Sequence, residues 1–309
     1  MYVAAKMGRR AIGIVNGIVN LFVLTVVLLL LTFGCYAIWD SAQVHSAADA
    51  VNYEIYKPTA ASEGASFEDL QAINPDVFAW LTLYGTNIDY PLVQGQDNIR
   101  YINTDAKGSH SLSGAIFLDS RSGPNFSDFS SIVYGHHMEN QVMFGEIAQF
   151  SEKSYFDARR YGMLYVNGQE RGLEFFAFVH ADAYDFDVFR VKITEREEQQ
   201  AYLDLLMQMA VHSRQDVSVT AGDQIVLLST CSPGSTNGRD ILVGKITDSA
   251  HRNPFEAEDA DRPHTIPMAD ELVSLWTQAP LWLKISAAAM VLPLILLALI
   301  LMDKKRKRR

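Results

Sequence analysis

Two long apolar segments, one near each end of the chain, constrain the fold most. Residues 11–39 contain no Asp, Glu, Lys or Arg, and residues 285–302 form a second apolar run that only Pro293 interrupts. The hydrocarbon core of a bilayer is spanned by about 20 helical residues, and membrane helices tolerate proline better than soluble helices do. We therefore predict transmembrane helices over residues 14–39 and 281–302.

The basic residues predict the orientation of these spans. Residues 1–13 carry a charge of +3 and residues 303–309 a charge of +5, so both ends are expected to be cytoplasmic. The whole chain carries −10, so the part between the ends carries −18. We expect a two-pass protein of the cell membrane with an acidic extracytoplasmic part. Nucleic acid is not expected as a partner, because its binding needs a basic face.

The first apolar segment has two alternative interpretations. It could be a cleaved signal peptide with an A-x-A site at residues 48–50, but the uncharged run is longer than the apolar part of a typical signal. It could also carry a lipid on Cys35, although Thr32 and Phe33 suit that processing poorly. A membrane helix remains the favoured prediction.

The residues between the predicted spans have the pattern of a strand-rich domain. Short apolar stretches alternate with Gly, Pro, Asn and Asp, which is typical of strands joined by turns. They are WLTLYG, GAIFLD, SIVYG, GMLYVNG, LEFFAFVHA, QIVLLST and DILVGKI. We predict one mainly β domain over residues 66–250, with a small, polar stalk over residues 40–65 and an acidic linker over residues 251–280.

Two helices are expected to interrupt the strands. The sequence SFED at Ser66 predicts a capping box before a short helix over Phe67–Ile73. Thr194 and Glu197 predict a second capping box, at the start of a helix over residues 194–210. Apolar residues recur along the longer helix at helical spacing, so that one face can pack on the sheet. They are Tyr202, Leu205, Leu206 and Met209.

Cys231 is the first candidate for chemistry. It is the sole cysteine in the predicted outer part, where thiols are usually paired. It ends the apolar run QIVLLST and begins the loop SPGSTNG, a position that a substrate can reach. A buried structural cysteine is the alternative, but such a residue is expected inside a strand rather than at its end.

Arg239 and His136 are the other candidates. If the runs around Cys231 and Arg239 form a hairpin, the guanidinium lies beside the thiol and can stabilise an oxyanion. His136 follows the strand-like SIVYG, which ends in a glycine, so we expect it to project from a loop, where an imidazole can act as a general acid and base.

A zinc site at His136 and His137 is disfavoured, because consecutive residues of an extended chain point to opposite faces and no HExxH or CxxC motif accompanies them. No metal or cofactor is expected. The three residues suit thiol acyl transfer, which ends in hydrolysis with water and in transpeptidation with an amine.

Several motifs together resemble class B sortases, the membrane-bound cysteine transpeptidases of Gram-positive bacteria. They are LLSTC ending in Cys231, Arg239, YGHHM around His136, INPDVFAWLTLYGTNIDYPLVQG, GAIFLDSR and the helix before the cysteine strand. The resemblance implies a closed eight-stranded β-barrel, with Cys231 as the nucleophile, His136 as the acid and base, and Arg239 as the stabiliser of the transition state. It also implies that secreted proteins with a C-terminal sorting signal are joined to an amine of a peptidoglycan precursor or of a pilin.

The chain also departs from the family pattern. Leu227 replaces the first Thr of TLxTC, and His137 replaces an Asn common in class B. A C-terminal span is more familiar in pilin-polymerising class C, so wall anchoring and pilus assembly both stay open. Two further alternatives remain. A hydrolytic cysteine peptidase of the papain or wall-amidase type places its cysteine before its histidine, unlike His136 and Cys231. A noncatalytic, membrane-tethered β-domain that binds the wall or a partner protein would not need Cys231.

Overall fold

The computed structural model describes residues 2–58 and 66–256. Its strands are β1 (Val77–Leu83), β2 (Asp89–Val93), β3 (Ile116–Leu118), β4 (Ser130–Tyr134), β5 (Tyr161–Val166), β6 (Gln169–Asp182), β7 (Ala210–Ser213), β8 (Gln224–Cys231) and β9 (Gly238–Thr247). Its α-helices are α1 (Tyr2–Ala48), α2 (Phe67–Ile73), α3 (Lys153–Ala158) and α4 (Arg196–Met209). Short 3-10 helices connect them: η1 (Ala50–Asn52), η2 (Glu54–Tyr56), η3 (Arg100–Ile102), η4 (Pro124–Phe126), η5 (Glu139–Gln141) and η6 (Gly145–Ser151). The second predicted span, over residues 281–302, and the basic tail over residues 303–309 lie outside the described residues.

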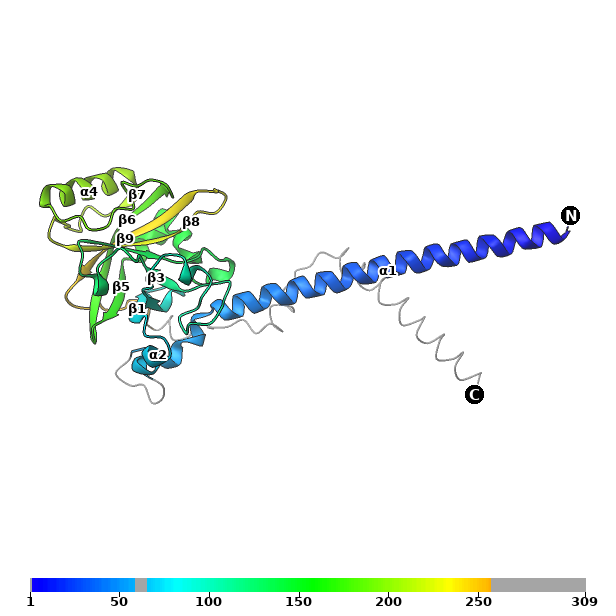
Figure 1. Cartoon of the computed structure of the whole chain (residues 1–309). Helices are drawn as coiled ribbons and strands as arrows, with labels where there is room; N and C mark the ends of the chain where they lie inside the picture. The colour runs from blue at the N-terminus through cyan, green and yellow to red at the C-terminus, as the bar shows by residue number, and fades with distance from the viewer. Residues whose placement is uncertain (1, 59–65, 257–309) are drawn as a thin grey trace. The chain divides into compact units, whose positions relative to one another are not determined.

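Eight strands form a closed barrel, as the resemblance to sortases implied (Figure 1). Their order is β5-β1-β2-β3-β4-β8-β9-β6, and the pairing of β5 with β6 closes the ring. The short strand β7 pairs with β6 as a ninth strand beside the ring. Neighbouring strands are antiparallel except for the parallel pairs β2–β3 and β4–β8. Closure gives almost every strand of the ring a partner on both sides, which removes exposed sheet edges.

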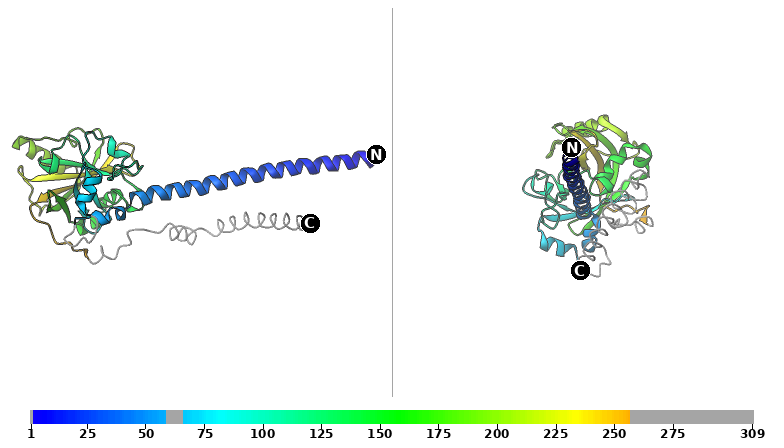
Figure 2. Two further views of the ribbon diagram at one scale, coloured as in Figure 1. Left: turned by 60° about the horizontal axis from the view of Figure 1, so that its bottom comes forward. Right: turned by 90° about the vertical axis from the view of Figure 1, so that its right-hand side faces the viewer.

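Both faces of the central strands are buried, which explains their continuous apolar sequences. The barrel interior holds an inner cluster that includes Trp80, Phe178, Leu228 and Leu242, none of them more than 1 % exposed. On the outside, α4 and the segment before it cover β4, β6, β8 and β9 and form an outer cluster. The views in Figures 1 and 2 show α4 on the outside of the strands.

The two predicted helices have different outcomes at their N-termini. The capping box of α2 is confirmed: the Ser66 amide donates to Asp69 Oδ2 over 2.7 Å, and the Asp69 amide donates to Ser66 Oγ over 3.3 Å. The predicted capping box of α4 is wrong, because this helix begins at Arg196, two residues after the predicted start, with Glu195 as its N-cap and no side-chain cap. Thr194 is therefore one residue too early to cap it.

The packed face of α4 is close to the prediction. Tyr202 and Leu206 are buried as expected, and Leu203 is buried beside them. Leu205 and Met209 are only partly buried. The buried face of α4 is therefore centred on Tyr202, Leu203 and Leu206, slightly rotated from the predicted one.

Residues 40–56 differ from the expected polar stalk. Helix α1 continues to Ala48, and Ala48 and Tyr53 are 1 % and 5 % exposed within the inner cluster. Tyr90 Oη donates to the Ala48 carbonyl over 3.0 Å. The chain packs against the barrel here because it carries aromatic side chains among its small residues. Among the described residues, Val15–Ala48 is the one helix long and apolar enough to cross a membrane, which indicates that the chain is anchored in one.

The chain after β9 also stays on the barrel for longer than predicted. His251 stacks on Tyr161 with ring centroids 4.3 Å apart, and Tyr84 Oη donates to the His251 carbonyl over 3.1 Å. Residues 251–256, placed at the start of the acidic linker by sequence, are thus part of the packed domain. The rest of that linker lies outside the described residues.

Candidate active site

Strands β8 and β9 form the hairpin that the sequence predicted. Cys231 and Arg239 are directly opposed in its register, at the two ends of the loop over residues 232–237. The amide of Ser232 donates to the Gly238 carbonyl over 2.9 Å and closes this loop. Cys231 is exposed, so its thiol can meet a substrate, unlike a cysteine in the core.

His136 lies at the same end of the sheet as Cys231. Strand β4 pairs in parallel with β8, and the last pair of the ladder joins Tyr134 to Ser229. The amide of Gly135 donates to the Ser229 carbonyl over 3.2 Å, so the strands are still side by side there. Two further residues along each strand bring His136 level with Cys231, and neighbouring strands are about 4.8 Å apart.

Strand alternation places Cys231 and Arg239 on the outer face of the barrel, and His136 follows two residues after Tyr134, the last paired residue of β4. Side chains two or four positions apart on a strand point to the same face. The residues at such positions before His136, before Cys231 and after Arg239 are buried in the outer cluster: Ile132, Leu227 and Ile241. The structure therefore brings Cys231 and Arg239 to opposed positions on one face, and the end of β4 that leads to His136 lies beside β8 at the same end of the sheet. Leu227 keeps the strand apolar in place of the family's threonine.

Most N–H groups of the Arg239 guanidinium are not used in hydrogen bonds within the described part of the chain. Its Nη1 donates to the Gly238 carbonyl over 3.0 Å, and it forms no ion pair within the described part of the chain. Arg239 is partly buried, which strengthens its interaction with a charge that develops nearby. The remaining N–H groups can face an oxyanion.

A backbone carbonyl orients the imidazole of His136. Nε2 of His136 lies 2.9 Å from the Ile102 carbonyl oxygen. A carbonyl only accepts, so Nε2 carries a hydrogen and Nδ1 is left to exchange a proton. Tyr101 holds this part of the chain, because its buried side chain donates to Asp76 Oδ2 over 2.7 Å.

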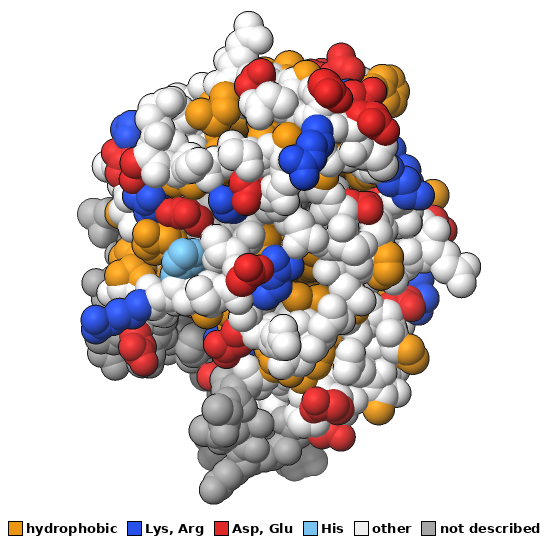
Figure 3. Space-filling model, turned by 90° about the vertical axis from the view of Figure 1, so that its left-hand side faces the viewer, with side chains coloured by type: hydrophobic (Ala, Val, Ile, Leu, Met, Phe, Trp, Pro, Cys, Tyr) orange, Lys and Arg blue, Asp and Glu red, His pale blue; other side chains and the backbone are white. Residues whose placement is uncertain are grey.

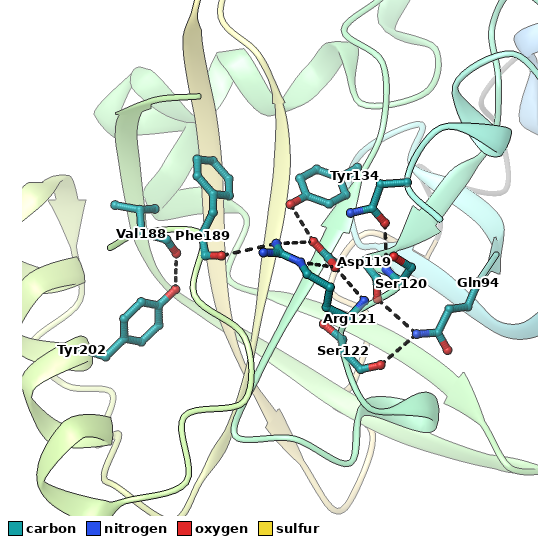
Figure 4. Close-up of polar contacts among 10 residues, drawn as sticks. Gln94, Asp119, Ser120, Arg121, Ser122, Tyr134, Val188, Phe189 and Tyr202 are labelled. Atoms are coloured by element: carbon teal, nitrogen blue, oxygen red, sulfur yellow. Dashed lines mark hydrogen bonds and ion pairs between the residues drawn. The ribbon is translucent and has the colours of Figure 1, made fainter. Parts of the chain in front are cut away.

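A buried carboxylate supports the surface beside the site. Asp119 is fully buried and accepts from Arg121 Nη2 over 2.7 Å and from Tyr134 Oη over 3.0 Å. Arg121 also donates to the Phe189 carbonyl over 3.4 Å, as Figure 4 shows. Burial raises the pKa of Asp119, but hydrogen bonds from the side chain and backbone of Arg121 and its positive charge outweigh this and hold the pKa below its usual value.

The segment between β6 and α4 forms one side of the site. Val188 and Ile193 are buried in the outer cluster, and Tyr202 Oη donates to the Val188 carbonyl over 2.5 Å (Figure 4). The amide of Ala183 donates to the Asn237 carbonyl over 2.8 Å and joins this segment to the β8–β9 loop. The sequence motifs did not reveal these supports. The charged pair in GAIFLDSR, directly after an apolar strand, was the available signal for Asp119 and Arg121.

Three other histidines interact with the backbone or pair in isolated bridges. Nε2 of His212 lies 2.6 Å from the Ser151 carbonyl oxygen, and His110 and His137 take part in isolated bridges with Thr104 and Met143. Among the described residues there is no group of three or more His, Cys, Asp or Glu side chains that could hold a metal ion. On the face of the molecule drawn in Figure 3, Lys and Arg side chains are interspersed with Asp and Glu rather than gathered into one basic patch.

A polar cavity at the opposite end of β8 and β9 is not a second site of this kind. Its lining includes Arg171, Asp223 and Lys245. Lys245 pairs with Asp223 over 2.9 Å, and Arg171 donates to Gln224 Oε1 over 2.8 Å. The cations there are therefore already satisfied by partners of the chain itself.

Comparison with known proteins identifies the family. Residues 81–247 match the Sortase domain family. Sortase B of Listeria monocytogenes is 33 % identical over 181 residues, which are 58 % of this chain and 72 % of that protein. The crystal structure of sortase B from the type II pilus of Streptococcus pneumoniae is 50 % identical, with a TM-score of 0.53, and the match covers 60 % of this chain and 100 % of that one. A Streptococcus pyogenes class B sortase involved in pilus biogenesis is 41 % identical, with a TM-score of 0.53 and coverage of 58 % and 97 %. The chain therefore belongs to the sortase family of cysteine transpeptidases, and within it to class B.

Proposed function

We propose that Cys231 is the nucleophile that cleaves a C-terminal sorting signal of a secreted protein. The observation that supports this is the strand register: Arg239 is paired with an exposed Cys231, and the β4–β8 ladder ends two residues before both His136 and Cys231. The sulfur attacks the scissile carbonyl carbon, an S–C bond forms, and the peptide C–N bond breaks. His136 takes the proton of the thiol and gives it to the leaving amine, and the N–H groups of Arg239 hold the negative oxygen.

The second half of the reaction transfers the acyl group to an amine. The acceptor amine attacks the thioester carbon and His136 takes its proton through Nδ1. The C–S bond breaks, and that proton passes to the sulfur to restore the thiol of Cys231. The hydrogen bond of Nε2 to Ile102 supports this role for Nδ1, because it keeps the same ring nitrogen available in both steps.

The acceptor that we propose is an amine of a pilin subunit rather than of a peptidoglycan precursor. Both solved relatives compared above are described as pilus sortases, and they are 50 % and 41 % identical to this chain. Competition for the thioester between a pilin peptide with a free lysine and a peptidoglycan stem peptide tests the choice. Preferred product formation with the stem peptide would contradict it.

We also propose that the domain of residues 66–250 faces outward and is held by two spans. The apolar helix Val15–Ala48 and the positive charge at both ends of the sequence support this topology. In intact cells, a membrane-impermeant maleimide should label Cys231, while tags at both termini should resist added protease. A protease-sensitive C-terminal tag would contradict the two-pass topology.

Trapping of the acyl intermediate tests the assignment of Cys231. The full chain in detergent micelles is incubated with a sorting-signal peptide without an acceptor, and its intact mass is measured. We expect an increase equal to the acyl fragment, in the wild type and in the matched control Cys35→Ala, which removes the other cysteine of the chain. Cys231→Ala should show no increase, and a persistent adduct in that variant would refute the assignment.

A further inference from the structure

A polar cluster of Ser232, Asp240 and His180 lies directly behind the candidate nucleophile. Asp240 is only 2 % exposed, and its carboxylate accepts from the Ser232 hydroxyl and from His180 Nδ1, the latter over 2.7 Å. Ser232 follows Cys231 in the chain, and Asp240 follows Arg239. The residue after Cys231 is therefore hydrogen-bonded to the residue after Arg239.

The register places Asp240 on the opposite face from the reacting groups. It pairs with Thr230 on β8 and with His180 on β6, three strands that lie side by side. The row two residues further along consists of inner-cluster residues, Phe178, Leu242 and Leu228. Asp240 therefore lies at the end of the barrel interior and does not compete for the donors of Arg239 on the outer face.

The cluster is not a second Ser-His-Asp catalytic site. In such a site the imidazole lies between the hydroxyl and the carboxylate and takes the hydroxyl proton. Here the carboxylate of Asp240 lies between Ser232 and His180, so the imidazole does not contact the hydroxyl and cannot take its proton. The arrangement can hold Ser232 and His180 in place, because a buried charged acceptor forms strong hydrogen bonds to its partners.

We propose that Asp240 is a positioning residue of the transpeptidase, which holds Ser232 and thereby fixes the backbone beside Cys231. This inference rests on the proposed role of Cys231. The loop that follows is mostly exposed. Its other hydrogen bonds run from Ser232 N to Gly238 O, from Ser235 N to Ser232 O, from Gly238 N to Ser235 Oγ over 3.0 Å and from Ala183 N to Asn237 O. Misplacement of a reacting group by about 1 Å costs roughly 100-fold in rate. The support is therefore expected to act on catalysis more than on folding.

Matched serine variants of one loop test the proposal. Ser232→Ala removes the hydroxyl that reaches Asp240, whereas Ser235→Ala removes a loop hydrogen bond that does not involve it. We expect Ser232→Ala to lower kcat by about 10-fold or more, with KM and the unfolding temperature nearly unchanged. Ser232→Thr should recover most of kcat, and Ser235→Ala should stay within about twofold of the wild type. Equal losses in both alanine variants, or no loss in either, would overturn the proposal.

A double-mutant cycle tests the link to Asp240. If Asp240 acts through Ser232, the variant Asp240→Asn with Ser232→Ala should be no slower than Asp240→Asn alone. Losses that multiply would show independent effects and overturn the proposal. Should Asp240→Asn fail to fold, the serine variants decide. Cys231→Ala is assayed beside them, since activity in that variant would refute the proposed function itself, whereas its inactivity beside a fully active Ser232→Ala would refute only the role of Asp240.

Discussion

Replacing Gly114 by alanine tests whether the Ile102 carbonyl orients His136. Gly114 has a φ of +61°, and a Cβ there would lie 2.5 Å from the Tyr101 carbonyl oxygen and 2.6 Å from that of Ile102. Real Cβ contacts do not fall below 3.0 Å, so the Ile102 carbonyl has to move by about 0.4 Å or more. A shift of that size away from the imidazole stretches the 2.9 Å hydrogen bond past about 3.2 Å, the end of the normal range.

The expected loss of activity follows from the charge on the imidazole. His136 is positively charged when it protonates the leaving amine, and a hydrogen bond to a charged group contributes about 2 kcal/mol. At about 1.4 kcal/mol for each factor of ten, the loss of this bond lowers kcat/KM by about 30-fold. KM should change little, because Ile102 acts on the imidazole rather than on the substrate.

Gly108 provides the matched control in the same loop. It also has a positive φ, +84°, but a Cβ there meets nothing within 4 Å. Both alanine variants therefore carry the strain of a left-handed backbone, roughly 1 to 2 kcal/mol, and only Gly114→Ala displaces the carbonyl. Cleavage of a sorting-signal peptide by the full chain in detergent micelles, together with thermal unfolding, compares the two.

The orienting role has a direct spectroscopic readout. In ¹⁵N spectra of histidine-labelled protein, His136 should show a protonated Nε2 and an unprotonated Nδ1 when it is neutral. Gly114→Ala should mix the two tautomers, whereas Gly108→Ala should not. Equal activity of the two variants, or a wild-type ring protonated at Nδ1 instead, would refute the reasoning.

Three other substitutions test the site and its support. Arg239→Lys should lower kcat by about 100-fold, because an ammonium lacks the planar fork of donors; near-normal turnover of a sorting peptide would make Arg239 structural. Asp119→Asn should destabilise the fold at neutral pH, since Arg121 holds the pKa of this carboxyl below its usual value. The ionised form therefore stabilises the protein above about pH 4, and the difference in unfolding free energy between wild type and variant should shrink as the pH falls below that; a difference that is constant with pH would contradict this. Tyr202→Phe should cost about 1 to 2 kcal/mol in unfolding free energy by leaving the buried Val188 carbonyl without its donor, and an unchanged denaturant midpoint would show that the bond contributes nothing.

Strands with both faces buried were the easiest part of the fold to predict. Residues 225–228 of the run QIVLLST are all apolar because Leu228 enters the barrel interior and Leu227 lies under α4. Strand β2 was not predicted as a strand, because it contains Pro91, which lacks the amide of a ladder hydrogen bond. Strand β7 was also missed, since its residues Ala210–Ser213 continue directly from α4 and are short and polar.

The contacts that support the site could not be predicted from local sequence patterns. Asp240 and His180 are 60 residues apart, and Arg121 and Phe189 are 68 residues apart. A hydrogen bond between such residues depends on the strand register, which no short motif specifies. The backbone carbonyl of Ile102 carries no side-chain signal at all.

From the sequence alone follow the apolar N-terminal helix, the strand-rich domain and the identities of the three candidate residues. Each of these depends on the chemical character of a short stretch, such as an uncharged run or a cysteine at the end of a strand. The strand pairing of the barrel determines which of those residues lie near one another. Parallel pairing of β4 with β8 and antiparallel pairing of β8 with β9 bring His136 and Arg239 to either side of Cys231. Alternation then places Cys231 and Arg239 on one face, because the side-chain period of a strand is two and a shift of one residue would turn them apart.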